Sequence, residues 1–175
     1  DRSKRLRITE DGLRRQEHVV VRPRPDPEAG PHVLLAALED HRAELRQAGH
    51  LTAVQEKTGL VLDPYFSGTK IEWLLRQVPG LLAQAEAGQA RFGTIDTFLI
   101  HRLSGGAAWV TDPSNASRTL LYNIHTQKWD DELCALLGVP LRSLPQVVHS
   151  QGPCAETRGM PGLPDGIPIA GIAGD

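Results

Sequence analysis

Apolar residues recur at helical spacing in the middle of the chain. The clearest set occupies positions i, i+3, i+4 and i+7: Ile71, Leu74, Leu75 and Val78. This spacing lines one face of an α-helix and does not fit the two-residue repeat of a strand, and Pro79-Gly80 ends the pattern. We therefore predict an amphipathic helix that starts near Thr69, with Ser67 or Thr69 as its cap.

Weaker helical patterns occur in four other segments. We predict helices over residues 33–50, 81–88, 94–103 and 130–138. In the third of these segments Thr94 is the expected N-cap, and Ile95, Leu99 and Leu103 fall on one stripe. In the fourth segment Asp130 is the expected N-cap.

Short β-branched and apolar runs predict strands between these helices. They cover Val19-Val20-Val21, residues 107–110 and residues 167–172. Residues 152–168 are rich in glycine and proline, so we interpret them as a surface loop that leads into the last strand. Because helices and short strands are mixed along the whole chain, we predict an α/β fold.

Composition excludes several classes of partner. The chain has 175 residues and a net charge of −2, which fits one domain or part of a larger one and argues against a general nucleic-acid binder. The longest apolar stretch, Val33 to Leu38, is far shorter than the roughly 20 residues that cross a bilayer. We therefore expect a cytoplasmic protein without a membrane partner. The two cysteines lack metal-site spacing, so no metal site is expected in the chain.

The sharpest candidate site is the carboxylate of Asp175, which follows Gly171-Ile172-Ala173-Gly174 at the end of an apolar run. This order predicts a buried strand that delivers its acid into a cleft at the strand's carboxyl end. A glycine-flanked carboxylate at that place lets a substrate hydroxyl approach, as a general base for phosphoryl transfer requires. The alternative is that Asp175 is the N-cap of a helix.

Two other polar blocks are candidates for ligand binding. In residues 63–70, a loop rigidified by Pro64 and freed by Gly68 can hold Tyr65 over a small polyol, with its hydroxyl as a hydrogen-bonding group. Residues 111–119 form the second block. Turns made by Asp, Asn, Ser and Thr side chains explain most of that block without a ligand.

These blocks occur in an order and at a spacing that closely resemble the FGGY carbohydrate kinase family, and within it the glycerol kinases. Further matching segments are residues 58–62, 92–97, 123–126 and 129–131. Residues 65–77 also resemble the first signature of the family. The resemblance runs from about Asp40 to Asp175, so residues 40–175 are expected to be part of the family's N-terminal domain. Residues 1–39 are an unmatched segment rich in proline and charge.

The resemblance implies ATP-dependent phosphorylation of glycerol to glycerol 3-phosphate, with Mg²⁺. It implies an α/β fold that is part of an actin-like ATPase (ribonuclease H-like) domain. By motif match, Asp175 takes the position of the catalytic base next to the substrate, and Tyr65 takes that of a tyrosine that contacts glycerol. The complete enzyme is compatible with a homo-oligomer.

Several family features are missing, among them an Arg-Glu pair and a tryptophan of the glycerol pocket, which leaves alternatives open. The first phosphate-binding hairpin, an acid followed by Gly-Thr-Thr, does not occur in residues 1–39. We therefore expect an internal fragment whose phosphate loop and adenine site lie elsewhere and which is inactive by itself. The alternatives are a kinase for another polyol or a pentulose, and a catalytically dead binding module derived from such a kinase.

Overall fold

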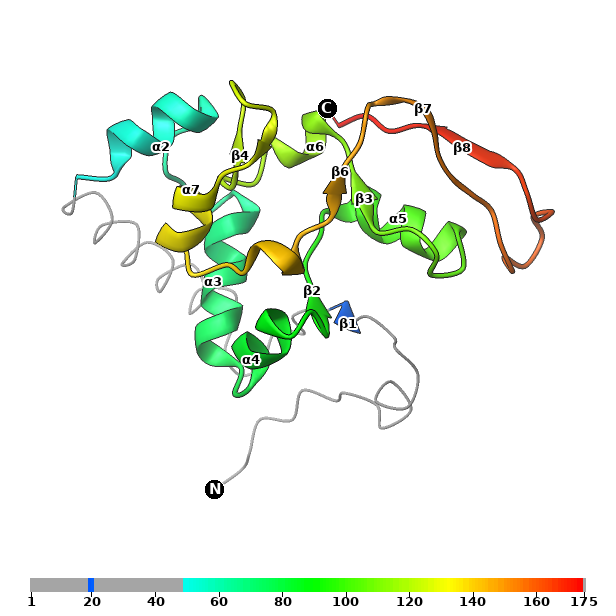
Figure 1. The fold of residues 1–175 in the computed structure, drawn as a ribbon, viewed down its shortest axis with the longest axis horizontal. Coiled ribbons are helices and arrows are strands. Elements are labelled where there is room, and N and C mark those ends of the chain that lie inside the picture. Colours follow the sequence, from blue (N-terminus) through cyan, green and yellow to red (C-terminus); the bar gives the residue numbers. More distant parts are fainter. Residues whose placement is uncertain (1–18, 21–48, 175) are drawn as a thin grey trace.

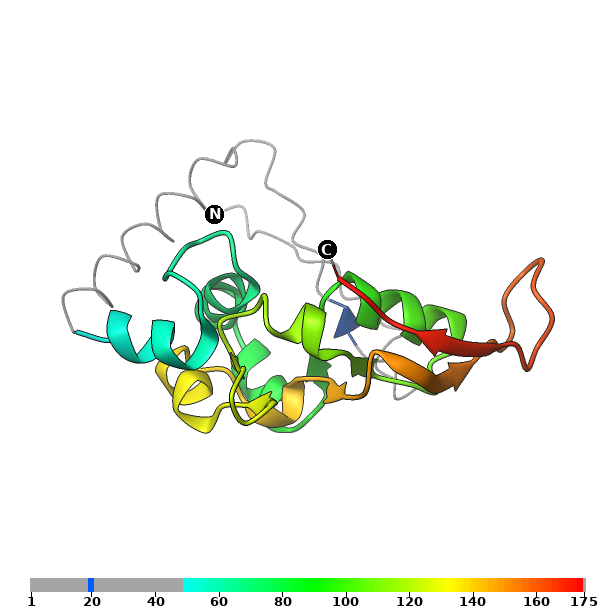
Figure 2. The same ribbon diagram turned by 90° about the horizontal axis from the view of Figure 1, so that it is seen from above.

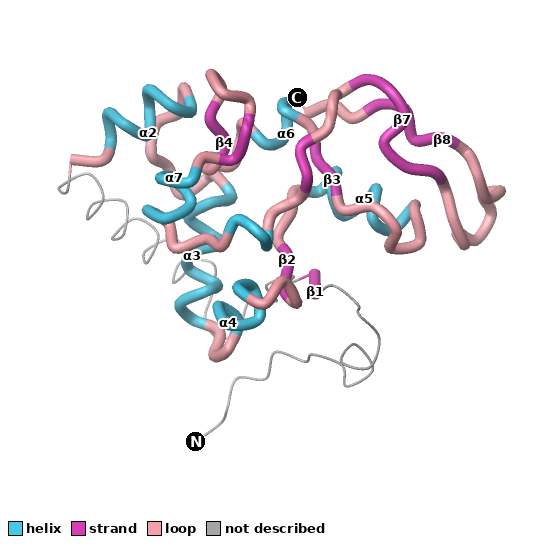
Figure 3. Tube along the Cα trace, viewed as in Figure 1, coloured by secondary structure: helices cyan, strands magenta, loops and turns pink. Residues whose placement is uncertain are grey.

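The computed structural model of the chain describes residues 19–20 and 49–174 (Figure 1). Its helices are α2 (Leu51–Thr58), α3 (Ser67–Gln77), α4 (Leu81–Glu86), α5 (Ile95–Leu103), α6 (Pro113–Ala116) and α7 (Asp131–Leu136), with a 3-10 turn η2 (Leu141–Ser143). Its strands are β1 (Val19–Val20), β2 (Ala90–Arg91), β3 (Val110–Thr111), β4 (Tyr122–Asn123), β5 (Lys128–Trp129), β6 (Gln146–Val147), β7 (Gln151–Glu156) and β8 (Pro168–Gly171). Figure 3 shows how helices and strands alternate along the trace.

The strands form four two-stranded sheets. β1 pairs with β2 and β3 pairs with β6 in parallel, whereas β4 pairs with β5 and β7 pairs with β8 in antiparallel orientation. Parallel pairs joined through helices, together with local antiparallel hairpins, confirm the predicted mixture of helix and strand. β1 confirms the predicted strand at Val19-Val20, while Val21 lies outside the described residues.

α3 confirms the strongest helical prediction. It runs to Gln77, and it buries Ile71, Leu74 and Leu75. The predicted cap is wrong, because Phe66 is the N-cap residue and no side chain bonds the free amides there. Thr69 instead donates its hydroxyl proton to the Phe66 carbonyl oxygen at 3.0 Å from within the helix.

The first turn of α3 is set by a backbone contact. The Gly68 amide donates to the Thr119 carbonyl oxygen at 2.8 Å. A Cβ atom at position 68 would lie 2.5 Å from that oxygen and 2.9 Å from Leu137 Cδ1. Only a residue without a side chain allows this approach, so Gly68 joins α3 to the segment after α6.

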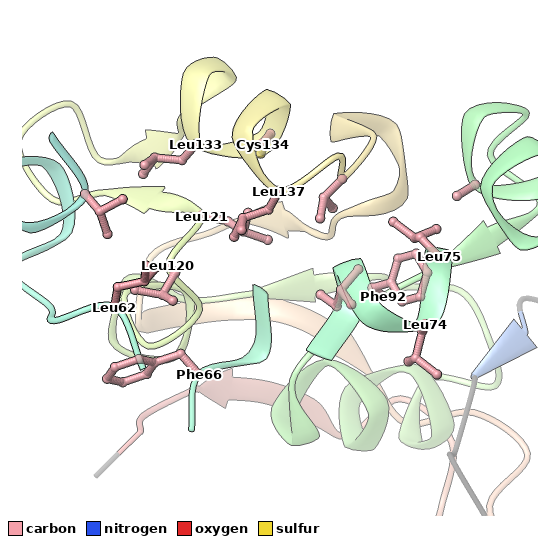
Figure 4. Close-up of a cluster of buried hydrophobic side chains, with 14 of the residues drawn as sticks. Leu62, Phe66, Leu74, Leu75, Phe92, Leu120, Leu121, Leu133, Cys134 and Leu137 are labelled. Carbon is pink, nitrogen blue, oxygen red and sulfur yellow. The ribbon is translucent and has the colours of Figure 1, made fainter. Parts of the chain in front are cut away.

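The main hydrophobic core lies between α3, α4 and α7 (Figure 4). The labelled members are Leu62, Phe66, Leu74, Leu75, Phe92, Leu120, Leu121, Leu133, Cys134 and Leu137. Burial raises the pKa of the Cys134 thiol to about 12, with smaller contributions from Asp130 and Asp131. The thiol is therefore neutral at physiological pH and acts as a small apolar side chain.

A second, smaller core lies beside α5. Ile100, Val110 and Ile172 are its buried members. α5 confirms the predicted helix, but its expected stripe is turned outward, with Ile95 67% and Leu99 51% exposed. The helix instead turns Ile100 toward β3, because that contact completes the second core.

Two further helices confirm their sequence patterns. α4 lies within the predicted residues 81–88, and α7 begins after Asp130, whose side chain accepts the amides of Glu132 and Leu133. Thr94 occupies the N-cap position of α5, but its side chain makes no cap hydrogen bond. The predicted helix over residues 33–50 lies outside the described residues apart from a turn at 49–50.

The carboxyl-terminal part differs most from the sequence-based prediction. Residues 151–156 form β7 rather than a loop, and β8 is a largely exposed antiparallel strand rather than a buried one. Neighbouring segments satisfy each other's backbone groups in this hairpin, with a register shift between Gln151 and Ala155. The hairpin extends away from α2, α3 and α7 in both ribbon views (Figure 2). The strand predicted over residues 107–110 also shifts, to Val110–Thr111.

A search of the described helices, α2 to α7, finds none with the length and apolar character that crossing a bilayer requires.

We expect Gly68→Ala to lower the free energy of unfolding of the chain by about 1–3 kcal/mol, the usual cost of overpacking. The added Cβ has no room against the Thr119 carbonyl and Leu137. Urea denaturation measures the change. Gly171→Ala is the matched control, since its nearest non-neighbouring atom is the Ser150 oxygen at 3.9 Å. Equal stability losses in the two variants would contradict the role given to Gly68.

Candidate functional site

The segment before Asp175 is fixed at three successive points. Gly171 pairs with Gln151 at the end of β8. The Ile172 amide then donates to the Ser150 carbonyl at 3.0 Å, and the Ile172 side chain is 6% exposed. Finally, the Gly174 amide donates to the Ser114 hydroxyl oxygen at 2.7 Å. Asp175 itself lies outside the described residues, so its assigned position rests on the sequence.

The carboxylate of Asp112 organises the polar cluster at this point. Asp112 is fully buried and directly precedes α6, whose first amides it caps. Its Oδ2 accepts from the hydroxyls of Ser114 at 2.7 Å and Ser150 at 2.6 Å. Its Oδ1 accepts from the amide and the side chain of Asn115 at 3.1 and 2.8 Å. The cluster joins α6 to the loop between β6 and β7.

The protonation state of Asp112 follows from these bonds. Burial alone would raise the pKa of the carboxyl group, and it is the largest single influence. Hydrogen bonds from Ser150, Ser114 and Asn115 outweigh it and hold the pKa below its usual value. Asp112 is therefore ionised and can only accept hydrogen bonds.

Tyr65 lies at the surface on a tightly held loop. Its side chain is exposed (75%), as a residue that meets a ligand requires. Its amide donates to Asp63 Oδ1 at 2.8 Å, and its carbonyl oxygen accepts from Lys70 Nζ at 2.7 Å. The Lys70 ammonium also lies 5.6 Å from the centre of the Tyr65 ring. The backbone of Tyr65 is thus fixed while its ring and hydroxyl stay accessible.

The Tyr65 loop and the Asp112 cluster are linked through residues 117–119. The rings of Tyr65 and Phe66 meet edge to face at 5.5 Å, and the Arg118 guanidinium lies 5.1 Å from the centre of the Phe66 ring. The Gly68–Thr119 hydrogen bond makes the second link. Two of the three candidate blocks, residues 63–70 and 111–119, are therefore in contact, and the third ends at Gly174 against Ser114.

The block around Asp130 has a structural role. Asp130 caps α7 and accepts from Asn123 Nδ2 at 2.8 Å and from Lys57 Nζ at 3.0 Å. Lys57 also reaches Glu132 at 2.6 Å. These contacts hold α2, β4 and α7 together although α2 is far from the other two elements in sequence. They account for the polar residues of this block without a ligand.

A cavity of about 610 Å³ lies elsewhere, between the end of α5 and the β7–β8 hairpin. Its lining includes Ser104, Cys154, Arg158 and Asp165, but neither Tyr65 nor Gly174. It is therefore separate from the candidate site.

The sequence missed the residues that hold this site together. The sequence predicts only turns for Asp112 and Ser114, and the Asp112 side chain does accept from the Ser114 and Asn115 amides. Their contact with Gly174, and the participation of Ser150, came from the folded chain alone. No local pattern marks Ser150, because its partner Asp112 is distant in sequence.

Residues 39–175 match the N-terminal domain of the FGGY family of carbohydrate kinases. The glycerol kinase of Alkalilimnicola ehrlichii is 54% identical over 132 residues, which are 75% of this chain and 26% of that protein. The glycerol kinase of Myxococcus xanthus is 55% identical over 131 residues, with the same coverage of 75% and 26%. This chain therefore spans about a quarter of the length of these relatives.

Solved structures agree with this match. The crystal structure of Plasmodium falciparum glycerol kinase with ADP aligns with a TM-score of 0.74 at 33% identity, over 79% of this chain and 28% of that one. The xylulose kinase from Rhodospirillum rubrum has a TM-score of 0.66 at 22% identity, over 77% and 27%, and so shows the fold alone.

The fold is thus part of the actin-like ATPase domain that carbohydrate kinases share. The chain belongs to the FGGY family of carbohydrate kinases, because that family's N-terminal domain matches most of its length.

We expect Asp112→Asn to lower the free energy of unfolding at neutral pH by at least about 1–3 kcal/mol, because buried donors lose their charged acceptor. The folded pKa of Asp112 lies below its unfolded value of 3.8. Its contribution is therefore present above that pH and is lost as the pH falls through the folded pKa. Urea denaturation across this pH range should show that the difference in free energy of unfolding between wild type and variant becomes smaller in acid. Asp131→Asn removes an equal charge from an exposed position and serves as the control. A difference in free energy of unfolding that does not change with pH would contradict the lowered pKa of Asp112.

Proposed function

We propose that this chain carries the catalytic base and one substrate-binding side chain of a cytoplasmic kinase that transfers a phosphoryl group from ATP to glycerol, giving glycerol 3-phosphate. Family membership supports the reaction class, and relatives named glycerol kinase at about 55% identity support the substrate. The structural observation that carries the proposal concerns residues 112–119. The Gly174 amide, next to Asp175, donates to Ser114 of this segment. The ring of Phe66, which packs against the accessible Tyr65, lies under Arg118 of the same segment.

In this proposal Asp175 takes the proton from the attacking hydroxyl of glycerol. A carboxylate positioned by a fixed peptide can orient that hydroxyl and accept its proton as the bond to phosphorus forms. Tyr65 offers its ring to the carbon chain of glycerol and its hydroxyl to one of the oxygens. Its fixed backbone limits the entropy lost on binding.

ATP and Mg²⁺ belong to the complete enzyme in this proposal. Within the described residues, no group of three or more His, Cys, Asp or Glu side chains could hold a metal ion.

The experiment is a chimera, since the chain spans about a quarter of its relatives. Residues 39–175 replace the matching segment of the Myxococcus xanthus glycerol kinase, and phosphorylation of glycerol and of D-xylulose is measured with MgATP. Turnover of glycerol is the expected result. Turnover of D-xylulose alone would favour a kinase for another polyol. A folded chimera without turnover would favour the catalytically dead binding module.

In that chimera we expect Asp175→Asn to lower kcat about 10²–10⁴-fold, the usual cost of losing a positioned general base. Glycerol affinity should stay within about tenfold, because the amide keeps the size and the polarity of the side chain. Steady-state kinetics measures both parameters. A variant whose kcat lies within about threefold of wild type would return Asp175 to a capping role.

We expect Tyr65→Phe to raise KM for glycerol more than it lowers kcat. The change removes one hydrogen bond, worth about 0.5–1.5 kcal/mol, and leaves the ring in place. The matched control is Tyr122→Phe, since Tyr122 is buried and its hydroxyl has no hydrogen-bond partner in the described part of the chain. An unchanged KM in the Tyr65 variant would assign Tyr65 to packing.

A further inference from the structure

The Gly174 amide binds a side chain at the point where the backbone pairing of its segment stops. Gly171 still pairs with Gln151, and the Ile172 amide still reaches the Ser150 carbonyl. The Gly174 amide instead donates to Ser114 Oγ at 2.7 Å. The orientation of the Ala173–Gly174 peptide unit therefore depends on one hydroxyl group.

The direction of the Ser114 proton is settled by the charge beside it. A hydroxyl carries one proton, and Ser114 Oγ lies 2.7 Å from Asp112 Oδ2. Because the ionised carboxylate only accepts, the Ser114 proton points to Asp112, and a lone pair remains for the Gly174 amide. The two bonds thus form a chain in which each donor has one acceptor, and the charge at its end strengthens it.

Two neighbours hold this chain of bonds in place. Ser150 donates its hydroxyl proton to the same carboxylate oxygen at 2.6 Å, while its carbonyl oxygen holds the Ile172 amide. The Asn115 amide group donates to Asp112 Oδ1 and lies against Gly174, where a Cβ would be 3.2 Å from Asn115 Oδ1. Gly174 is therefore confined by Asn115 on one side while Ser114 holds its amide.

We propose that Ser114, oriented by Asp112, is a positioning residue for the catalytic base at position 175. This inference rests on the function proposed above, in which Asp175 takes the proton from the attacking hydroxyl. Ser114 acts by holding the Gly174 amide, and Gly174 directly precedes the proposed base in the chain. Reactions that depend on alignment lose up to about 10²-fold in rate when a group shifts by about 1 Å.

The first test examines the hydrogen bond in the 175-residue chain itself. Hydrogen exchange of the Gly174 amide, followed by NMR, should become about tenfold faster in Ser114→Ala, the effect of one lost hydrogen bond. Ser114→Thr keeps the hydroxyl and should keep the slow exchange. The matched control is Ser117→Ala at the C-cap of α6, since the Ser117 hydroxyl donates to the Ser114 carbonyl and not to Asp112 or Gly174. Unchanged exchange in Ser114→Ala would overturn the proposal, whatever the reaction of the enzyme.

The second test uses kinetics in the chimera. Ser114→Ala should lower kcat about 10- to 100-fold while KM for MgATP stays within about threefold, and Ser114→Thr should restore kcat. In an Asp175→Asn background, Ser114→Ala should cost less than about twofold more, because both changes act on one group. If the double variant instead loses kcat by the product of the two single factors, the positioning role is overturned and general destabilisation is indicated. If Asp175→Asn alone leaves kcat unchanged, the proposed base fails, and the exchange result still decides whether Ser114 holds Gly174.

Discussion

The burial of one charge, the Asp112 carboxylate, constrains the part of the molecule that surrounds the candidate site. An ionised carboxylate without exposure is stable only when hydrogen bonds replace its water, and here two serines and Asn115 supply them. Those donors come from α6 and from the loop before β7. The fold must bring both segments to the same point, and Ser114 then extends the arrangement to Gly174. The placement of three segments therefore follows from a single requirement of electrostatics.

Local signals explain which parts of the fold could be predicted. α3 and α7 were predicted because their apolar residues repeat at helical spacing and because Asp130 sits where a free amide needs an acceptor. α5 was predicted as a helix, yet its Ile95 and Leu99 are exposed. Apolar spacing therefore predicted the helix but not which of its faces is buried. That face depends on which neighbour completes the core, and sequence periodicity carries no information about the neighbour.

Long-range contacts explain what could not be predicted. The β7–β8 hairpin was hidden because Pro153 and several glycines favour a loop, whereas a register shift accommodates them in a strand. Ser150 carries no motif, and its bond to Asp112 exists only in the folded chain. Tyr65 and Asp175 were predicted from their local sequence patterns, and the resemblance to FGGY kinases assigned their roles. The sequence could suggest their chemistry, but the contacts through Phe66 and Arg118 came from the structure.

The pairing of strands also has a consequence for the order of folding. The strands of the β7–β8 hairpin are close in sequence, so the hairpin closes a short loop and can form early and by itself. The parallel pair formed by Val19–Val20 and Ala90–Arg91 joins residues far apart in the chain. Closing this long loop costs conformational entropy before the pair can form. β1 can therefore pair only after a distant segment has approached it, whereas β7 and β8 pair with a neighbour in sequence.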